Sequence, residues 1–246
     1  MTVAAVSLQA EIMMALATVT DPELDQPLTE LGFVRSVAID DDGVTVHLRL
    51  PTAFCSPNFA YLMASDTQDA LRRIGGVGEV HVLLDDHHDS EKINAGLAAD
   101  AGYVGTFGSE AGESLDELRR TFLVKAHTAA MERCLASLLR RKALDPNEIH
   151  RLTLRDLPDG KEKSALMRRR LALGLSTCPN SRVLVDDDGH PLPPEAAPVR
   201  LRFARSVRIS LEGNAHFCRG LLATRYADGH DVAIPQFTNT RSGSPR

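Results

Sequence analysis

The chain has 246 residues, 43% of them hydrophobic, and a formal net charge of −5. This apolar content suits one large or two ordinary domains and excludes a wholly disordered chain. No apolar run approaches the roughly 18 residues of a membrane span, and the first residues lack the basic segment of a secretory signal. The four cysteines lie far apart, which excludes a disulfide framework. We therefore expect a cytoplasmic protein with no membrane contact.

Charge is distributed unevenly along the chain. Residues 1–112 hold 5 basic and 17 acidic residues, a balance of −12, whereas residues 113–246 hold 23 and 16, a balance of +7. A stretch rich in Gly, Ala and Ser separates the two parts and is typical of a connection. We predict an N-terminal domain over residues 1–94, a connection over 95–113 and a basic domain over 114–246.

The N-terminal part has the pattern of a small α+β domain. Val44, Val46 and Leu48 alternate with polar residues, which predicts a half-buried strand. The predicted elements are a helix over residues 8–19, strands over 32–39 and 44–50 joined by a turn at 40–43, a helix over 57–74 that ends before two glycines, and a strand over 80–84. The fold class is α/β (α+β), with an αββαβ order and a small mixed sheet covered by helices.

A cysteine precedes the second predicted helix. Ser56 suits the N-cap and Pro57 the first helical position, so Cys55 lies just before a helix N-terminus. The helix dipole favours a thiolate there, and thiolates bind soft metals and iron–sulfur clusters. The alternative is a buried cysteine that behaves as a small apolar residue. Position alone leaves both interpretations open.

Two polar segments are candidate metal sites. Asp21, Glu23 and Asp25 surround a proline, and such carboxylates hold a hard cation or orient a neighbour; the alternative, which position alone favours, is an acidic turn. His87 and His88 follow the last strand within an acidic loop that suits iron, zinc or manganese. Adjacent residues on an extended chain point opposite ways, so a solvated loop is the alternative. Glu91 completes this candidate set; the loop as a whole is Asp85-Asp86-His87-His88-Asp89-Ser90-Glu91.

These features in this order resemble a known family. The matching segments are Asp21-Pro22-Glu23, Leu31-Gly32-Phe33-Val34, Leu50-Pro51-Thr52, Cys55 and Gly75-Gly76-Val77. They resemble the bacterial iron–sulfur cluster assembly domain of SufT-type and PaaD-type proteins over about residues 8–86. One departure is that Cys55-Ser56-Pro57 stands where the family often has Cys-Pro.

The resemblance implies an αββαβ fold and a role in assembling, carrying or delivering an iron–sulfur cluster or iron. It implies that Cys55 is a cluster or iron ligand supported by Asp21 and Glu23. Because one cysteine cannot hold a cluster unaided, the partners would be a client metalloenzyme, other cluster assembly proteins or a second copy of the chain. Asp86-His87 and Asn94-Ala95-Gly96 resemble a longer subset linked to gene clusters for soluble diiron monooxygenases. We therefore expect an accessory maturation factor rather than a turnover enzyme.

The C-terminal part is predicted to be a helix-rich α+β region. The predicted elements are helices over residues 114–139, from 145 and over 163–175, a short strand over 182–185, extended segments over 199–211 and 217–226, and a polar tail over 238–246. On a strand, His216 and Cys218 would share one face and could bind zinc with Cys178, with Cys134 or water as fourth ligand. The alternative is that these are ordinary buried thiols, because no CxxC motif is present.

Three other functions compete with the maturation factor. The first is a mononuclear metal-dependent enzyme that uses His87 and His88 in their acidic loop. The second is a nucleic-acid-binding regulator that uses basic helices such as the one carrying Arg168, Arg169 and Arg170. Because the whole chain is acidic and no reader motif is evident, docking of an acidic partner is favoured over nucleic acid. The third is a thiol enzyme in which Cys55 pairs with a histidine.

Overall fold

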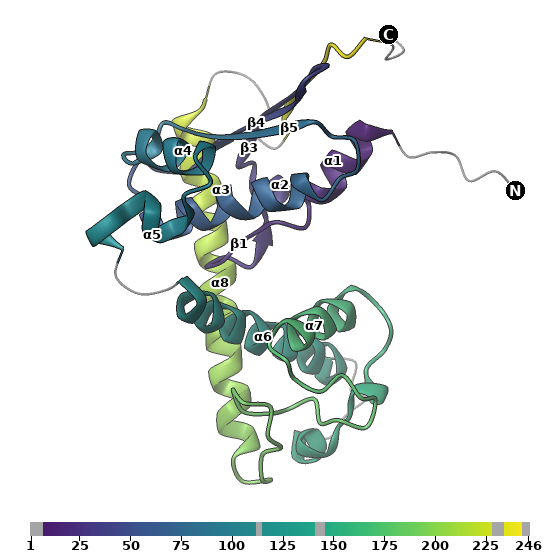
Figure 1. The fold of residues 1–246 in the computed structure, drawn as a ribbon. Coiled ribbons are helices and arrows are strands. Elements are labelled where there is room, and N and C mark those ends of the chain that lie inside the picture. The colour runs from purple at the N-terminus through teal and green to yellow at the C-terminus, as the bar shows by residue number, and fades with distance from the viewer. Residues whose placement is uncertain (1–6, 112–114, 141–145, 228–233, 243–246) are drawn as a thin grey trace, which may run out of the picture. The chain divides into compact units, whose positions relative to one another are not determined.

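The structure, a computed structural model, describes residues 7–111, 115–140, 146–227 and 234–242 (Figure 1). The chain divides into two compact units. The first unit joins Met1–Leu115 with Asn214–Arg246, and the second is Asp116–Gly213. The first unit is therefore discontinuous in sequence, whereas the predicted domains run without interruption along the chain.

The first unit contains the predicted αββαβ order. Its described elements are α1 (Leu8–Leu16), β1 (Thr20–Asp21), β2 (Gln26–Pro27), α2 (Leu28–Leu31), β3 (Val34–Ile39), β4 (Gly43–Arg49), α3 (Pro57–Arg72), β5 (Glu79–Asp85), α4 (Ser90–Ala98), α5 (Gly102–Phe107), the 3-10 helix η1 (Gly108–Glu110) and β6 (Gln236–Asn239). The predicted order corresponds to α1, β3, β4, α3 and β5 and is confirmed. Helix α3 begins at Pro57, as a proline in the first turn favours, and ends just before Gly75 and Gly76.

Four strands form a mixed sheet in the order β5-β4-β3-β6. Strands β3 and β4 are antiparallel, with Val37 opposite Val46, whereas β4 and β5 are parallel, with Val46 opposite Val82. A Cβ atom at Gly43 would lie 2.0 Å from the carbonyl oxygen of Glu79. Only glycine therefore allows the start of β4 to approach β5 so closely.

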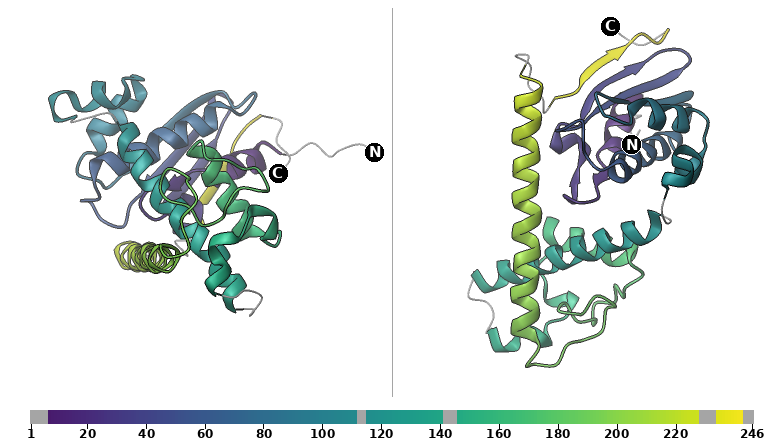
Figure 2. Two further views of the ribbon diagram at one scale, coloured as in Figure 1. Left: turned by 90° about the horizontal axis from the view of Figure 1, so that it is seen from below. Right: turned by 90° about the vertical axis from the view of Figure 1, so that its left-hand side faces the viewer.

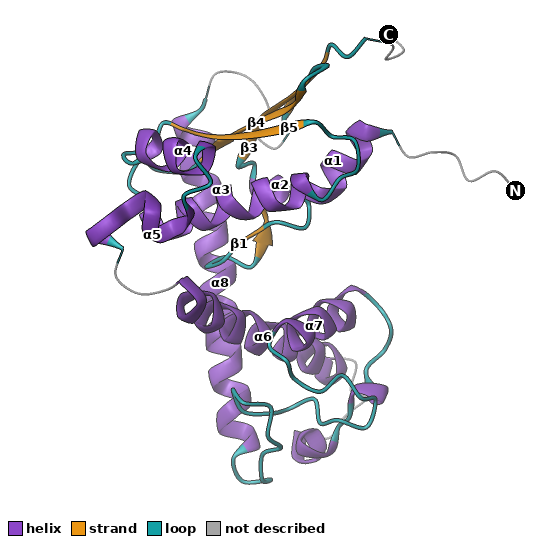
Figure 3. Cartoon of the chain, in the orientation of Figure 1, coloured by secondary structure: helices purple, strands orange, loops and turns teal. Residues whose placement is uncertain are grey.

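The two faces of this sheet differ. Val44, Val46 and Leu48 are buried on one face, while Thr45 and His47 between them stay partly exposed on the other. Helix α3 packs against β5 and α1, and this packing covers the apolar face of the sheet (Figure 3). Burying each large apolar side chain contributes roughly 1.5–3 kcal/mol. A one-residue slip would expose them all, so the alternation fixes the register.

The polar tail supplies the fourth strand. β6 pairs in parallel with β3, with Phe237 opposite Val37 (Figure 2, right). Arg241 donates hydrogen bonds to the carbonyl oxygens of Asp40, at 3.1 Å, and Gly76, at 3.1 Å. Residues 238–239 of the predicted polar tail are thus part of a strand, and residues 243–246 lie outside the described part. A pairing between segments so distant in sequence leaves no local pattern.

Residues 95–111, the described part of the predicted connection, are more than a linker. The last turns of α4 and the whole of α5 lie there, and Phe107 is 8% exposed. Its ring packs against Tyr61 and Tyr103, with ring centroids 6.1 and 5.0 Å away. The abundance of Gly and Ala predicted a linker, but Gly96 here allows α4 and α5 to approach, because a Cβ atom would meet the Thr106 side chain.

The second unit is mostly helical. Its elements are α6 (Leu115–Arg140), the 3-10 helices η2 (Pro146–Arg151) and η3 (Leu154–Asp156), α7 (Lys161–Ala172) and the first part of α8 (Ala197–Arg225). The long helix predicted over 114–139 and the helix predicted over 163–175 are confirmed as α6 and α7. The helix predicted from residue 145 is a 3-10 helix where described, and the segment 182–185 forms only isolated bridges.

Helix α8 contradicts both predicted extended segments. Its buried residues are Ala197, Ala204, Leu211, Ala215 and Leu222, whose spacings of seven, seven, four and seven fit one helical face. By contrast, Val199 and Ile209 are 59% and 52% exposed. Large apolar residues of the segment predicted to be extended thus lie on both sides of α8, because Leu211 is buried. No helix in the described ranges is both long and apolar enough to cross a membrane.

Candidate functional site

Cys55 lies in a loop that connects strand β4 to helix α3, here called the Cys55 loop (residues 50–56). Its thiol is partly exposed and lies 3.6 Å from the Thr52 hydroxyl. That hydroxyl accepts a hydrogen bond of 3.1 Å from the amide of Phe54. Ser56 occupies the N-cap position as predicted, although its side chain makes no capping hydrogen bond. The loop thus places a partly accessible sulfur next to the start of α3.

His87 fastens the loop after β5 (residues 86–89) to the Cys55 loop. Its Nε2 lies 2.8 Å from the carbonyl oxygen of Cys55, and its Nδ1 accepts a hydrogen bond of 3.1 Å from the amide of Asp89. These partners assign the proton to Nε2, which donates to Cys55. Next to it, the His88 amide donates to Ala53 at 2.9 Å. His87 is only 5% exposed, so it positions the Cys55 loop.

In this arrangement, the side chains of the predicted histidine metal site do not gather around one point. Both ring nitrogens of His87 are engaged, and His88 is exposed beside the ring of Phe54, 6.0 Å between centroids. Glu91 is exposed on α4. His87 is buried and His88 is exposed, so the two side chains lie in different surroundings. Among the residues that the structure describes, no three His, Cys, Asp or Glu side chains gather as a metal-binding group.

Asp21 organises the acidic turn between β1 and β2. Its carboxylate accepts hydrogen bonds of 2.8 Å from the amides of both Glu23 and Leu24. The side chain is buried, and this burial raises its pKa to about 6 although the two hydrogen bonds oppose the shift. Glu23 is partly buried next to it. Asp21 therefore holds the backbone of the turn, which is the structural alternative that position alone favoured.

The sequence pattern groups Cys218 with Cys178 and His216, but the structure places it with other residues. It lies on the part of α8 that belongs to the first unit, and it packs against the same core as Cys55. Burial raises the pKa of the Cys218 thiol to about 11, and the nearby Asp21, Cys55 and Glu23 raise it further. The sulfur of Cys218 therefore belongs to the surroundings of Cys55 and the acidic turn.

The zinc site predicted from Cys178, His216 and Cys218 rested on a strand that does not exist. On helix α8, His216 and Cys218 are about 200° apart around the axis, and His216 is exposed. Cys178 is exposed and belongs to the second unit, as does the buried Cys134. The helical conformation thus removes the shared face on which the prediction depended.

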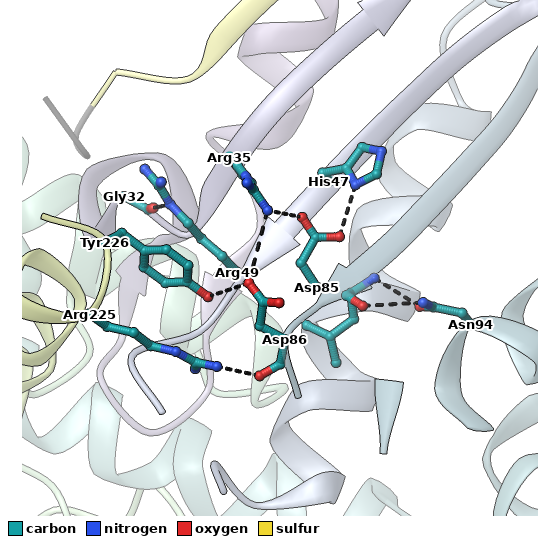
Figure 4. Close-up of polar contacts among 10 residues, drawn as sticks. Gly32, Arg35, His47, Arg49, Asp85, Asp86, Asn94, Arg225 and Tyr226 are labelled. Carbon is teal, nitrogen blue, oxygen red and sulfur yellow. Dashed lines mark hydrogen bonds and ion pairs between the residues drawn. The ribbon is translucent and has the colours of Figure 1, made fainter. Parts of the chain in front are cut away.

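A polar network surrounds the end of β5 (Figure 4). Asp85 accepts a hydrogen bond from Arg35 and faces the Nδ1 atom of His47, both at 2.9 Å. Beyond it, the Asn94 side chain bonds both the amide and the carbonyl of Leu84, at 2.8 and 3.2 Å. These contacts fix the strand end from which the loop of His87 departs.

The end of α8 joins the same network. Arg225 donates to the carbonyl oxygen of Leu50 at 3.0 Å. It also donates to the carbonyl oxygen of Asp86, while the Tyr226 hydroxyl donates to the Asp86 carboxylate at 3.2 Å (Figure 4). The Arg225 and Tyr226 contacts were not foreseen from the sequence, because α8 was predicted to be extended. They connect α8 to both loops that carry the candidate site.

The sequence pattern also does not identify Arg49, because the alternation along β4 assigns it to the polar side of the strand. It is 7% exposed, its Nε donates to Gly32 at 3.2 Å, and its guanidinium lies 5.1 Å from the centre of the Tyr226 ring. The one sign of this role in the sequence is that Arg49, a charged residue, directly precedes the apolar Leu50 and the proline of the Cys55 loop.

The predicted basic surface is partly internal. Arg170 is 1% exposed and donates to the carbonyl oxygens of Ser176, at 2.8 Å, and Arg182, at 3.0 Å. Arg208 pairs with Glu132, and Arg200 pairs with Asp187. Arg170 must therefore be removed from the set of residues expected to bind phosphates, because it lies in the core of the second unit.

Comparisons with known proteins agree with the resemblance seen in the sequence. Residues 9–82 match the family described as "Iron-sulfur cluster assembly protein". An uncharacterized protein of Methanocaldococcus jannaschii is 31% identical over 85 residues, which are 34% of this chain and 87% of that protein. The chain belongs to the iron–sulfur cluster assembly family. No solved structure matches the chain.

Longer relatives match little more than a third of this chain, and the chain spans about a quarter of their length. An "Iron-sulfur cluster carrier protein" of Mycobacterium leprae is 36% identical over 100 residues, 39% of this chain and 26% of that protein. A protein of the same name from Mycobacterium tuberculosis is 38% identical over 86 residues, 35% of this chain and 22% of that protein. Asp21 and Cys55 lie inside the family segment of residues 9–82, whereas His87, Cys218 and Arg225 lie outside it.

Proposed function

We propose that the first unit holds an iron–sulfur cluster transiently at Cys55 and delivers it to another protein. The observation that carries this proposal is the partly exposed Cys55 thiol on a loop fastened by His87, within the segment that matches the family. The curated relatives named as cluster carriers support it. The acidic turn at Asp21 and Glu23 supports the site by holding the neighbouring backbone.

The cluster is cargo in this proposal, and transfer is an exchange of ligands. The Cys55 thiol loses its proton when its sulfur binds iron. A thiolate of the recipient later replaces the Cys55 sulfur on the iron, and no oxidation state changes. A partly exposed sulfur suits such an exchange because the recipient must reach the iron. We propose a client metalloenzyme as the recipient. The longer subset that the sequence resembles favours a recipient within a soluble diiron monooxygenase system. Because diiron centres are held by carboxylates and histidines, the cluster would go to a component of that system that carries thiolates.

Anaerobic reconstitution with iron and sulfide tests this function. Visible absorption and analysis of bound iron and sulfide are compared for the wild type, Cys55→Ser and Cys178→Ser. We expect a sulfide-dependent chromophore that Cys55→Ser loses and Cys178→Ser keeps, because Cys178 is an exposed thiol of the other unit. A chromophore that survives Cys55→Ser, or iron binding that needs no sulfide, would contradict the proposal.

A further inference from the structure

Helix α8 brings a second thiol to the side of the first unit that carries Cys55. Ala215, Cys218 and Leu222 follow one another at spacings of three and four, which places them on one helical face. Ala215 and Leu222 are 0% and 1% exposed within the core of the first unit. Cys218 lies between them, so its side chain is directed toward this core rather than toward solvent.

Two hydrogen bonds fix this part of α8 to the first unit. The Arg219 guanidinium donates to the side chain of Gln26, next to the acidic turn, at 2.6 Å. Two turns later, Arg225 donates to Leu50 at the start of the Cys55 loop. Cys218 directly precedes Arg219, so the part of α8 that carries it is fixed to the first unit near the acidic turn and, further along, near the Cys55 loop.

Cys55 and Cys218 are both packed against the core of the first unit. Like Cys55, Cys218 is only partly buried. Two soft sulfur atoms thus lie on the border of the same core, and neither is closed off from a ligand.

We propose that Cys218 is a second protein ligand of the cluster held at Cys55. Ordinary clusters take four thiolate or mixed ligands, so two from this chain would leave two iron positions for the recipient or a small thiol. Each thiol that binds gives up one proton and forms one sulfur–iron bond, and no electrons move. This proposal rests on the proposed function and assigns the ligand set of the same site.

Two ligands on one scaffold hold the cargo longer than one. Linking two binding groups raises the overall affinity by roughly 10²–10⁴-fold when both can engage at once. A carrier that held its cluster only through Cys55 would lose it readily to any chelator. Cys218 would thus set the residence time of the cluster, while Cys55 remains necessary for loading.

The first test measures the proximity of the two thiols without any cluster. Anaerobic wild-type protein is treated with dibromobimane, which becomes fluorescent when both of its arms alkylate thiols, and the linked peptides are mapped. We expect a link between Cys55 and Cys218 that is absent in Cys55→Ser and Cys218→Ser and unchanged in Cys178→Ser. A folded wild type that gives no such link would overturn the proposal.

The second test measures the lifetime of the reconstituted chromophore in excess iron chelator. We expect Cys218→Ser and Cys218→Ala to lose the chromophore roughly a hundredfold faster than the wild type, with Cys178→Ser unchanged. Circular dichroism verifies that the variants are folded. Equal lifetimes in the wild type and both Cys218 variants would overturn Cys218 as a ligand and leave the proposed function intact. A chromophore that survives Cys55→Ser would instead overturn the proposed function.

Discussion

The two compact units use their charged side chains for different purposes. In the first unit, Arg225 and His87 bind backbone carbonyls of the Cys55 loop and so position one partly exposed sulfur. In the second unit, Arg170 and the pair of Arg208 with Glu132 stabilise the unit's own core. The comparison teaches that an acidic or basic balance in the sequence does not by itself locate a binding surface.

The tyrosines of the chain allow the two units to be followed separately. All three tyrosines, Tyr61, Tyr103 and Tyr226, belong to the first unit, and the chain has no tryptophan. Tyrosine fluorescence therefore reports on the first unit alone, whereas far-UV circular dichroism reports on the helices of both. A variant that affects one unit should separate the two signals.

The largest effect is expected from Arg170→Met. The substitution leaves the carbonyl oxygens of Ser176 and Arg182 without their donor in a buried site. Hydrogen bonds from a charged donor contribute roughly 1.5–3 kcal/mol each, so we expect a loss of about 4 kcal/mol in the second unit. Urea unfolding followed by circular dichroism should shift while tyrosine fluorescence does not. Arg168→Met, at an exposed position of the same helix, is the control.

Acid should weaken the second unit through His127. Burial, followed by the nearby charges of Arg170 and Arg200, lowers the pKa of His127 to about 4, and its Nε2 is buried without a hydrogen-bond partner among the described residues. Below pH of about 6.5 the unfolded chain binds the proton more readily, so the free energy of unfolding falls as the pH drops toward 4, by up to about 3 kcal/mol.

Urea midpoints between pH 7 and 4 check this prediction, with His127→Leu as the comparison. The variant cannot bind the proton in either state, so its midpoints should depend less steeply on pH than those of the wild type. Identical pH profiles for the two proteins would show that His127 does not carry the effect. Tyrosine fluorescence again separates the first unit from the second.

In the first unit, His87→Ala should release the Cys55 loop. The substitution removes the hydrogen bond to the Cys55 carbonyl and leaves that oxygen unpaired, a cost of about 2 kcal/mol. We expect a lower urea midpoint by tyrosine fluorescence and faster alkylation of Cys55 by iodoacetamide. His88→Ala, whose side chain is exposed, should change neither quantity. Equal alkylation rates in both variants would show that the loop is held by other contacts.

The smallest effect is expected at the edge of the sheet. Arg241→Ala removes the hydrogen bonds that connect β6 to the turns at Asp40 and Gly76, at a cost of about 1 kcal/mol. Amide hydrogen exchange along β3 should become faster where it pairs with β6, with no change along β5. Unchanged exchange in β3 would mean that strand pairing alone holds β6 in place.

Local patterns in the sequence were sufficient for part of this molecule. The alternation of Val44, Val46 and Leu48 predicted β4, and the Ser56-Pro57 signal predicted the start of α3. Both predictions depend on residues close together in the chain, where backbone preference and burial favour the same structure. The location of Cys55 before α3 followed from the same signals.

What could not be predicted depends on contacts between distant segments. Helix α8 buries small residues such as Ala204 and Ala215 and exposes Val199 and Ile209, so its apolar pattern imitates a strand. Its conformation decides where Cys218 and Arg225 lie. The function of His87 likewise depends on a carbonyl oxygen 32 residues away in the chain, which no periodicity reveals.

The insertion of the second unit within the first has a consequence for how the chain is made. During synthesis, the segment from Asp116 to Gly213 leaves the ribosome before the last turns of α8 and strand β6. Chains generally fold from the N-terminus during translation. The nascent first unit must therefore wait, with its sheet edge unpaired and the Cys55 loop without Arg225, until α8 and β6 have emerged. A ribosome that stalls within the second unit would leave the Cys55 thiol open to premature metal binding or oxidation.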